Sequence, residues 1–444
     1  AHDVTLSYAG VRHVSRTSRV GNSYNGGTVN EVLSTTQEFY DRQGRLHQVR
    51  EQAEANGTDT TTTYFYDVGN RLNRVRQATS AGTQNRWFNY DNRGFLNSEQ
   101  HPEKDGSVSY SNYDARGHAR NKTDGPHNLS FTYDRAERLT QVTGSGGQVL
   151  KTFSFGTSGT ANGRLETATR YNYVGSPFNA TVAVTESYVY GGRQGRPSSR
   201  TTQMFFNGNP MESFTQTWSW NPLGDPGSIG YPQCAFAGCT PVARTVSPGY
   251  TNGFLTSIPG WVSAISYHPN SMVNQVTHSN NVVDTQANDP NRMKRPASIT
   301  VAKSTSTLFA TGTYGYDGAG NVKKVGTDYY VYDRLGRLKE GTAFQAGSYR
   351  QTYGFDSFGN LTAITSYVNG IGSTRTHAVA ATTNRLSLGG YDAAGNQTTW
   401  GSYVYTWDPT GAMKSYQGGG NDWAYAYDDF FNGIFFPYGA PDRD

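Results

Sequence analysis

The sequence has few aliphatic residues and no long apolar run. Hydrophobic residues of all kinds make up 35% of the 444 residues, and the mean hydropathy is −0.67. No stretch is long enough to span a bilayer as a helix, so we expect no membrane span. No segment has the periodicity of a convincing amphipathic helix either. Strands are therefore left as the main candidates for regular structure.

Charge is also sparse, and it is not segregated. Charged residues make up 16% of the chain and the net charge is +4, with an isoelectric point near 8.8. The basic residues are scattered, whereas a nucleic-acid-binding protein would cluster Lys and Arg on one element. We expect no nucleic-acid partner.

Motifs that carry chemistry are missing as well. The nine histidines show no metal-ligand spacing, and neither a Gly-x-Ser-x-Gly elbow nor a phosphate-binding glycine loop is present. Turn aspartates could ligate Ca²⁺ where two turns converge, but their role in the turns already explains them. We expect no enzymatic activity, no cofactor and no metal.

Only two cysteines occur, Cys234 and Cys239. A zinc site would need further Cys or His at close spacing. In a secreted protein such a pair staples a surface loop, whereas in a cytosolic protein it stays reduced. We expect a disulfide between them. The chain begins at Ala1 rather than Met, which indicates a processed form or part of something longer.

Aromatic residues are abundant, with 31 Tyr, 21 Phe and 7 Trp. The low hydropathy taken alone would favour disorder. Aromatic side chains argue the reverse, because each buries a large area and suits a strand.

A repeat runs along most of the chain: Tyr-Asp, then Gly a few residues on, then Arg-Leu. Residues 40–46 and 332–338 give the full pattern almost letter for letter. A repeat of this range means that the chain is an array. The repeat residues that we single out are Tyr40, Asp41, Gly44, Arg45, Leu46, Tyr66, Asp67, Tyr90, Asp91, Gly94, Tyr113, Asp114, Gly117, Tyr133, Asp134, Tyr316, Asp317, Gly320, Tyr332, Asp333, Gly336, Arg337, Leu338, Asp356, Gly359, Tyr391, Asp392, Gly395, Asp408 and Gly411.

Each repeat has the signature of a β-hairpin. A segment in which aromatic or β-branched residues alternate with others comes first. A short polar tract with Gly follows, and then a second alternating segment. The Asp can accept backbone N–H groups further along the turn, and the Gly can take the positive φ that closes the loop. Tyr40 and Leu46 would form a cross-strand pair, while Arg45 can lie on an aromatic face or bond a carboxylate.

The repeats define the predicted domains. Residues 1–36 are expected to form degenerate strands or a cap, and residues 37–429 the repeat array. The array includes drifted copies at about 155–310, such as Trp220-Asn221 with Gly224. Residues 430–444 leave the pattern and form a tail.

The Tyr-Asp-x-x-Gly-Arg-Leu pattern resembles the YD or Rhs repeat of bacterial Rhs polymorphic toxins, of the C component of Tc toxins and of teneurin ectodomains. The resemblance covers about residues 40–428. It implies an all-β fold, in which an array of antiparallel hairpins forms one long curled or spiralling sheet, a hollow shell or barrel. In the toxins the shell sequesters a C-terminal toxin, and in teneurins it is a scaffold for cell adhesion.

The chain departs from the Rhs toxins at its end. Those toxins carry an Asp-Pro-x-Gly type motif for aspartyl self-cleavage. The nearest string here, Asp408-Pro409-Thr410-Gly411, is explained as an ordinary repeat with Pro in its turn. The tail is too short to be a toxin, so no protease residue is carried over.

Two functions remain open. The first is a non-catalytic, secreted bacterial shell that encapsulates or scaffolds a cargo or toxin segment. The second is an extracellular or cell-surface adhesion protein that binds a glycan or a protein, or another copy of itself through sheet edges. Trp423 and Trp407 are the candidate glycan contacts, although alternation within strands favours core packing for them. Both functions place the chain outside the cytoplasm.

Overall fold

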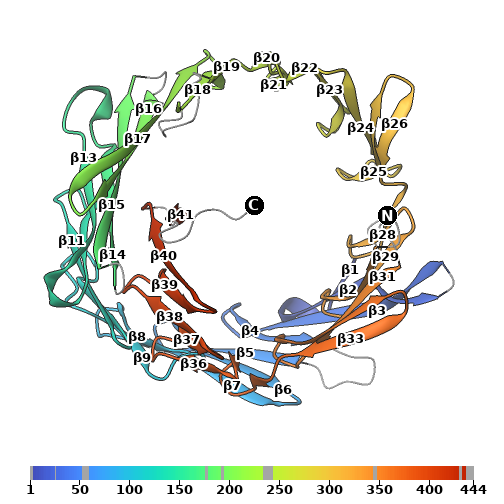
Figure 1. Cartoon of the computed structure of the whole chain (residues 1–444). Helices are drawn as coiled ribbons and strands as arrows, with labels where there is room; N and C mark the ends of the chain where they lie inside the picture. Colours follow the sequence, from blue (N-terminus) through green and yellow to red (C-terminus); the bar gives the residue numbers. More distant parts are fainter. Residues whose placement is uncertain are drawn as a thin grey trace. The chain divides into compact units, whose positions relative to one another are not determined.

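The computed structural model describes residues 4–25, 27–52, 60–175, 179–191, 195–233, 244–343, 348–429 and 433–436. These residues form antiparallel β-strands joined by short turns, with three short 3-10 turns and no α-helix, so the all-β prediction is confirmed (Figure 1). None of the helical turns in the described part of the chain is long and apolar enough to cross a membrane. Cys234 and Cys239 lie outside the described residues.

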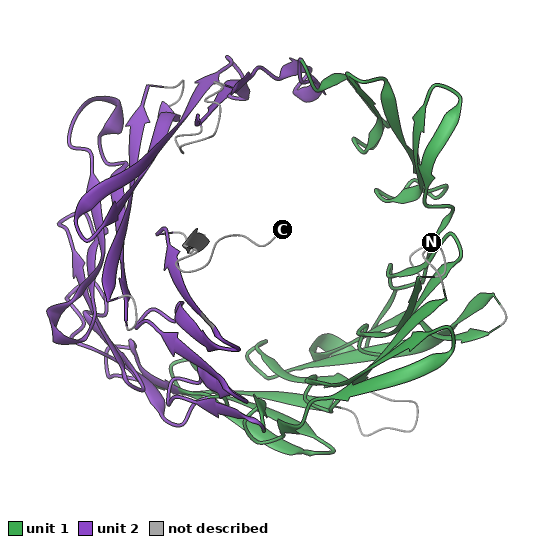
Figure 2. Ribbon diagram, viewed as in Figure 1, with its two compact units in different colours: residues 1–89, 100–103, 260–387 green, residues 90–99, 104–259, 388–444 purple. Residues whose placement is uncertain are grey.

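The chain divides into two compact units (Figure 2). Unit 1 takes residues 1–89, 100–103 and 260–387, and unit 2 takes residues 90–99, 104–259 and 388–444. The domain boundaries predicted at residues 36 and 429 remain predictions. Strand structure runs across the first of them, because residues 28–40 form one strand.

Unit 1 contains the following elements: β1 (Thr5–Tyr8), η1 (Gly10–Arg12), β2 (His13–Asn25), β3 (Thr28–Tyr40), β4 (Leu46–Glu51), β5 (Thr60–Tyr66), β6 (Leu72–Thr79), β7 (Gly82–Tyr90, all but its last residue), β22 (Val262–Tyr267), β23 (Val273–His278), β24 (Val282–Asn288), β25 (Pro296–Lys303), β26 (Ser306–Ala310), β27 (Tyr314–Tyr316), β28 (Val322–Val325), β29 (Asp328–Tyr332), β30 (Leu338–Ala343), β31 (Tyr349–Phe355), β32 (Leu361–Val368), β33 (Ile371–Thr376), β34 (Val379–Ala380) and β35 (Arg385–Leu386).

Unit 2 contains these elements: β8 (Leu96–Gln100, all but its last residue), β9 (Ser107–Ser111), β10 (Asn121–Asp124), β11 (His127–Tyr133), β12 (Leu139–Thr143), η2 (Ser145–Gly147), β13 (Val149–Phe155), η3 (Gly159–Ala161), β14 (Leu165–Val174), β15 (Ala180–Tyr190), β16 (Pro197–Phe206), β17 (Asn209–Trp220), β18 (Pro226–Tyr231), β19 (Arg244–Val246), β20 (Gly249–Thr251), β21 (Phe254–Ser257), β36 (Gly389–Tyr391), β37 (Gln397–Trp400), β38 (Tyr403–Trp407), β39 (Met413–Gly418), β40 (Asn421–Tyr427) and β41 (Gly433–Phe436).

The strands pair with their neighbours along the chain, as a succession of hairpins requires. In repeat after repeat the register shifts at the Tyr, so that Tyr40 lies opposite Leu46 and Tyr332 opposite Leu338. A one-residue bulge of this kind increases local twist and turns a side chain toward a new neighbour. The bulge therefore places the Tyr at a defined point beside the turn.

Each unit has a second layer of strands built from later residues. In unit 1, β29 packs on β2 and β3, and Tyr329 stacks on Tyr24 with ring centroids 3.5 Å apart. In unit 2, β40 packs on β14. Ala426 of β40 joins Val182 and Val184 of β15 in a buried apolar cluster. We call the contact zone between the two layers within a unit its seam.

Candidate functional site

The turn of the first repeat is organised by the Asp41 carboxylate. Its Oδ1 accepts the backbone N–H groups of Gln43 at 2.8 Å and Arg45 at 3.0 Å. Its Oδ2 accepts the Arg45 Nε–H at 2.6 Å. The backbone closes the same loop, because the Gly44 N–H donates to the Asp41 carbonyl. One carboxylate thus satisfies three donors, and such charge-assisted bonds are stronger than neutral ones.

The same geometry recurs along the chain. In every one of these turns the Asp carboxylate accepts the backbone N–H four residues further on: Asp41, Asp67, Asp91, Asp114, Asp134, Asp317, Asp333, Asp356, Asp392 and Asp408. The third residue after the Asp has positive φ throughout. It is Gly in eight of these turns, Asn70 in the second and Glu137 in the fifth. Only Gly adopts this conformation without a steric penalty.

The repeat Tyr links its repeat to the one before. The Tyr66 hydroxyl donates to the Leu46 carbonyl at 2.8 Å, just after the preceding turn. Tyr332 donates to Val322 at the corresponding position, also at 2.8 Å. Burial raises the pKa of the Tyr332 hydroxyl, so it keeps the proton that it donates. Further bonds of this kind join Tyr133 to Ala119, Tyr190 to Leu165, Tyr316 to Pro296, Trp220 to Pro197, Trp407 to Gln397 and Tyr427 to Met413.

The repeat Arg links its repeat to the one after. The Arg45 guanidinium, already bound to Asp41, lies over the Tyr66 ring at 4.4 Å from its centroid. Arg337 lies over Phe355 at 4.6 Å in the same way. A guanidinium over an aromatic face is attracted by the ring quadrupole. In the turns that carry this Arg, which are those of Asp41, Asp67, Asp134 and Asp333, Tyr and Arg together couple the turn to its neighbours in both directions.

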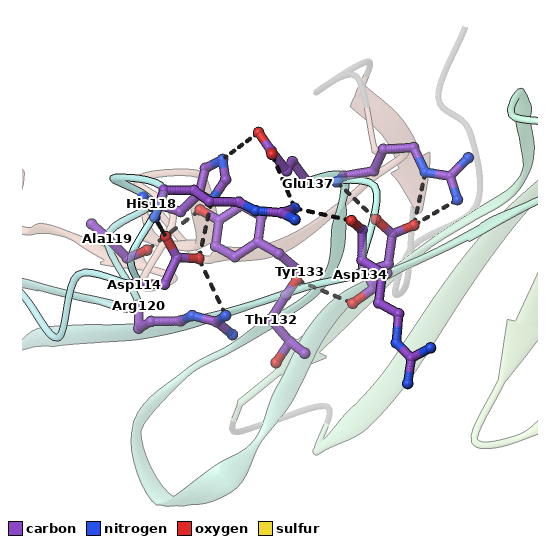
Figure 3. A network of polar contacts seen from close by, with 12 residues as sticks. Asp114, His118, Ala119, Arg120, Thr132, Tyr133, Asp134 and Glu137 are labelled. Carbon is purple, nitrogen blue, oxygen red and sulfur yellow. Dashed lines mark hydrogen bonds and ion pairs between the residues drawn. The ribbon is translucent and has the colours of Figure 1, made fainter.

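Figure 3 shows the neighbouring turns of Asp114 and Asp134. In the Asp114 turn His118 takes the place of the Arg, whereas the Asp134 turn keeps Arg138. The His118 Nδ1 lies 3.0 Å from the Asp114 Oδ2, and its Nε2 lies 3.8 Å from the Glu137 Oε2. The His118 ring stacks on Tyr133 with centroids 4.7 Å apart. The carboxylates here are engaged by neighbouring side chains. Among the described residues, no group of three or more His, Cys, Asp or Glu is placed to hold a metal ion.

In unit 1, turn groups of the later layer also bind the earlier layer. Asp317 is 1% exposed. Its Oδ2 accepts the backbone N–H of Gly21 at 3.0 Å. The Asn22 side-chain amide donates to the Tyr332 carbonyl at 3.0 Å. Lys323 and Glu31 form an ion pair at 2.6 Å across the same seam.

The seam of unit 2 contains a buried arginine. Arg170 of β14 is 1% exposed. It forms an ion pair with Asp408 and donates to Thr410 Oγ1 at 3.2 Å, both in one later turn. Asn172 exchanges two hydrogen bonds with the backbone of Tyr427, at 3.0 and 2.9 Å. A turn carboxylate that closes its own loop therefore also neutralises a buried cation of the layer beneath.

The two candidate glycan contacts lie on adjacent hairpins of unit 2. Trp407 ends β38, and its indole N–H donates to the Gln397 carbonyl at 2.7 Å, which is the inter-repeat link. Trp423 of β40 is half-buried and lies opposite Tyr416. Glycan contact at these residues remains a prediction. Sequence reasoning missed Arg170 and Asn172, although polar residues at alternate positions of β14 were the available signal.

Comparison with known proteins gives structural matches only. No protein-family model matches this chain, and no curated protein matches it. The chain matched in the crystal structure of TcdB2-TccC3-TEV is 14% identical, with a TM-score of 0.59 over 94% of this chain. The match in the TcdB2-TccC3-Cdc42 structure is 14% identical, with a TM-score of 0.56 over 95%. That in the TcdB2-TccC3 structure is 15% identical, with a TM-score of 0.56 over 98%.

These are Tc toxin complex chains with a YD-repeat shell, so the resemblance stated from the sequence is confirmed at the level of the fold. At this identity the likeness shows the fold alone. The chain spans 30%, 30% and 29% of the length of the three matched chains.

Breaking the ion pair across the seam of unit 2 is expected to destabilise the protein strongly. The change Asp408→Asn leaves the Arg170 charge buried without its carboxylate, and we expect the free energy of unfolding to fall by about 3 kcal/mol. The matched control is Asp134→Asn, whose partner Arg138 is partly exposed at a turn, so that this variant should lose much less stability. Urea denaturation measures both. Equal losses in the two variants would contradict the role assigned to Arg170, and Arg170→Met with Asp408→Asn should recover most of the loss.

Stability is expected to fall on acidification. The backbone N–H of Arg71 lowers the pKa of Asp67, and the Arg138 side chain lowers that of Asp134, in each case against an opposing effect of desolvation. A carboxyl whose folded pKa lies below its unfolded value, about 3.9, contributes stability that is present above that value. This contribution is lost as the pH falls through the folded pKa.

Urea denaturation at several pH values tests this expectation. The contribution of these turn carboxylates to the free energy of unfolding should change little between pH 5 and 7 and should decrease below about pH 4. The variant Asp67→Asn should lose less stability between pH 5 and 3 than the wild type. A steeper acid loss in that variant would be the contrary result.

Proposed function

We propose that this chain forms the wall of a secreted, non-catalytic YD-repeat shell that encloses a polypeptide cargo segment. One observation carries the proposal: the polar side chains of the repeat turns link repeat to repeat and layer to layer. The Asp closes its own turn, the Arg reaches the next ring and the Tyr hydroxyl returns to the previous repeat. Contacts of this kind suit a wall that must hold its repeats together.

The described turns offer little for catalysis. A general acid or base needs a carboxyl or imidazole with a pKa near the working pH and a free path to substrate. The turn carboxylates have the opposite properties, since backbone and side-chain donors lower the pKa of Asp67, Asp114 and Asp134. They are held ionised as acceptors, which suits a structural part.

The layered seams support enclosure more than adhesion. A wall that retains cargo must resist separation of its layers. Buried polar contacts such as Arg170 with Asp408 and Asp317 with Gly21 fix one register between them. Such contacts favour a unique arrangement because any slip leaves a buried charge or amide unpaired. The fold likeness to Tc toxin complex chains agrees with this function.

Protease mapping of the natively produced protein tests the proposal. We expect brief proteinase K treatment, followed by peptide mass spectrometry, to reveal a protected segment outside the repeat array. That segment should become cleavable at the urea concentration that unfolds the array. Asp408→Asn should release it at a clearly lower urea concentration, whereas Asp134→Asn should shift that concentration much less.

Two outcomes would contradict enclosure. One is cleavage of every non-repeat segment at the rate found in unfolded protein. The other is protection that persists unchanged after the array has unfolded, since the protection would then come from a separately folded domain.

A further inference from the structure

A groove of about 380 Å³ lies on the surface of β29–β32 in unit 1. We call it the tyrosine groove and define it by Tyr330, Gly341, Tyr349, Gln351, Tyr353 and Ser366. It belongs to none of the turns or seams described above. Its volume lies within the usual range for small-molecule sites.

The groove exists because small residues stand between two tyrosines. Gly341 of β30 lies between Tyr330 and Gln351 in the register of three neighbouring strands. A Cβ at Gly341 would lie 3.3 Å from Tyr330 Cδ1, so the ring leans over the glycine. Ala343, the next residue on this face of β30, lies opposite Tyr349. The surface of the sheet is therefore recessed between the rings of Tyr330 and Tyr349.

The groove faces away from the seam. Tyr329 and Val331, the neighbours of Tyr330 on β29, are buried at 5% and 3% exposure, and Tyr329 stacks on Tyr24 of the earlier layer. Side chains alternate along a strand. Tyr330 therefore points to the opposite face, and Tyr349 on the groove's rim is 46% exposed.

A row of neutral polar groups runs along one side. The Tyr353 hydroxyl donates to Gln351 Oε1 at 2.8 Å, and Gln351 Nε2 donates to Ser366 Oγ at 3.0 Å. An amide carries two N–H donors, and hydroxyl and carbonyl oxygens each have two lone pairs. The row thus holds its own geometry and keeps capacity for a ligand that both donates and accepts.

Charge is turned away from the groove. Arg350 and Tyr367 both contribute to its lining, and the Arg350 guanidinium is held over the Tyr367 ring at 4.0 Å from its centroid. In the register, Arg350 lies opposite Thr342 and Tyr367, on the face opposite to that of Tyr349 and Gln351. The ligand chemistry that fits is uncharged, with one flat apolar face and several hydroxyls.

We propose that the tyrosine groove binds a neutral pyranose ring of an oligosaccharide. The apolar C–H face of the sugar stacks on Tyr349, and the sugar hydroxyls exchange hydrogen bonds with Gln351 and Ser366. An aromatic ring supplies a large, rigid contact area at low entropy cost, and the amide and hydroxyl fix the orientation. This binding does not depend on enclosure of a cargo.

Isothermal titration of the full chain with neutral hexasaccharides of glucose, galactose and N-acetylglucosamine tests the proposal. We expect at least one to bind, with a dissociation constant raised tenfold or more by Tyr349→Ala. Gly341→Leu, which fills the groove, should abolish binding. The control is Tyr231→Ala, which removes a ring of similar exposure, 45%, in unit 2 and should change nothing.

Tyr349 is exposed, so the Tyr349→Ala variant is expected to fold, and its circular dichroism and melting temperature check this. The proposal is overturned if none of the three hexasaccharides binds. So would equal binding by wild type and by a folded Tyr349→Ala variant. A concentration-dependent dimer that Gly341→Leu abolishes, without sugar binding, would instead assign the groove to a second copy of the chain.

Discussion

The structure depends on one interaction, the capture of backbone N–H groups by a turn aspartate. In the Asp41 turn a single carboxylate holds two amides and the Arg45 guanidinium, and other repeats reproduce the arrangement. The guanidinium is then held flat over the next aromatic ring. A chain with few aliphatic residues can stay folded in this way, because contacts such as Arg45 with Tyr66 and Tyr66 with Leu46 fix one hairpin against the next. Small apolar clusters such as that of Leu129, Val142 and Leu150 supplement these links.

In the seams, turn carboxylates also bind groups of a second layer. Asp317 and Asp408 close their own turns and bind Gly21 and Arg170 of the earlier layer with the same carboxylates. A residue that is already fixed by its turn loses little further entropy when it makes a second contact. The later layer therefore docks through groups that the repeat has already ordered, which explains how a polar seam can hold the two layers of a unit together.

Much of the fold was predictable from the sequence. The alternation and the Asp–Gly turns predicted hairpins, and the paired positions of Tyr40 and Leu46 follow from the turn length. The Tyr hydroxyl bond to the preceding repeat was not predictable, because it joins residues such as Tyr66 and Leu46 whose approach depends on the bulge. The seams were also invisible: Arg170 and Asp408 are 238 residues apart, and one sequence gives no sign of such pairing.

The central claim is that adjacent repeats are energetically coupled through the Arg of one and the aromatic ring of the next. A double-mutant cycle on Arg295→Met and Tyr316→Leu tests it most directly. Arg295 binds the Asp289 carboxylate at 2.7 Å, as Arg45 binds Asp41, and its largely buried guanidinium lies 3.9 Å from the Tyr316 ring centroid. Urea denaturation should give a coupling energy of about 1–2 kcal/mol. The separated pair Arg295 and Tyr66 should be additive within about 0.5 kcal/mol. Additivity of Arg295 and Tyr316 would contradict the account.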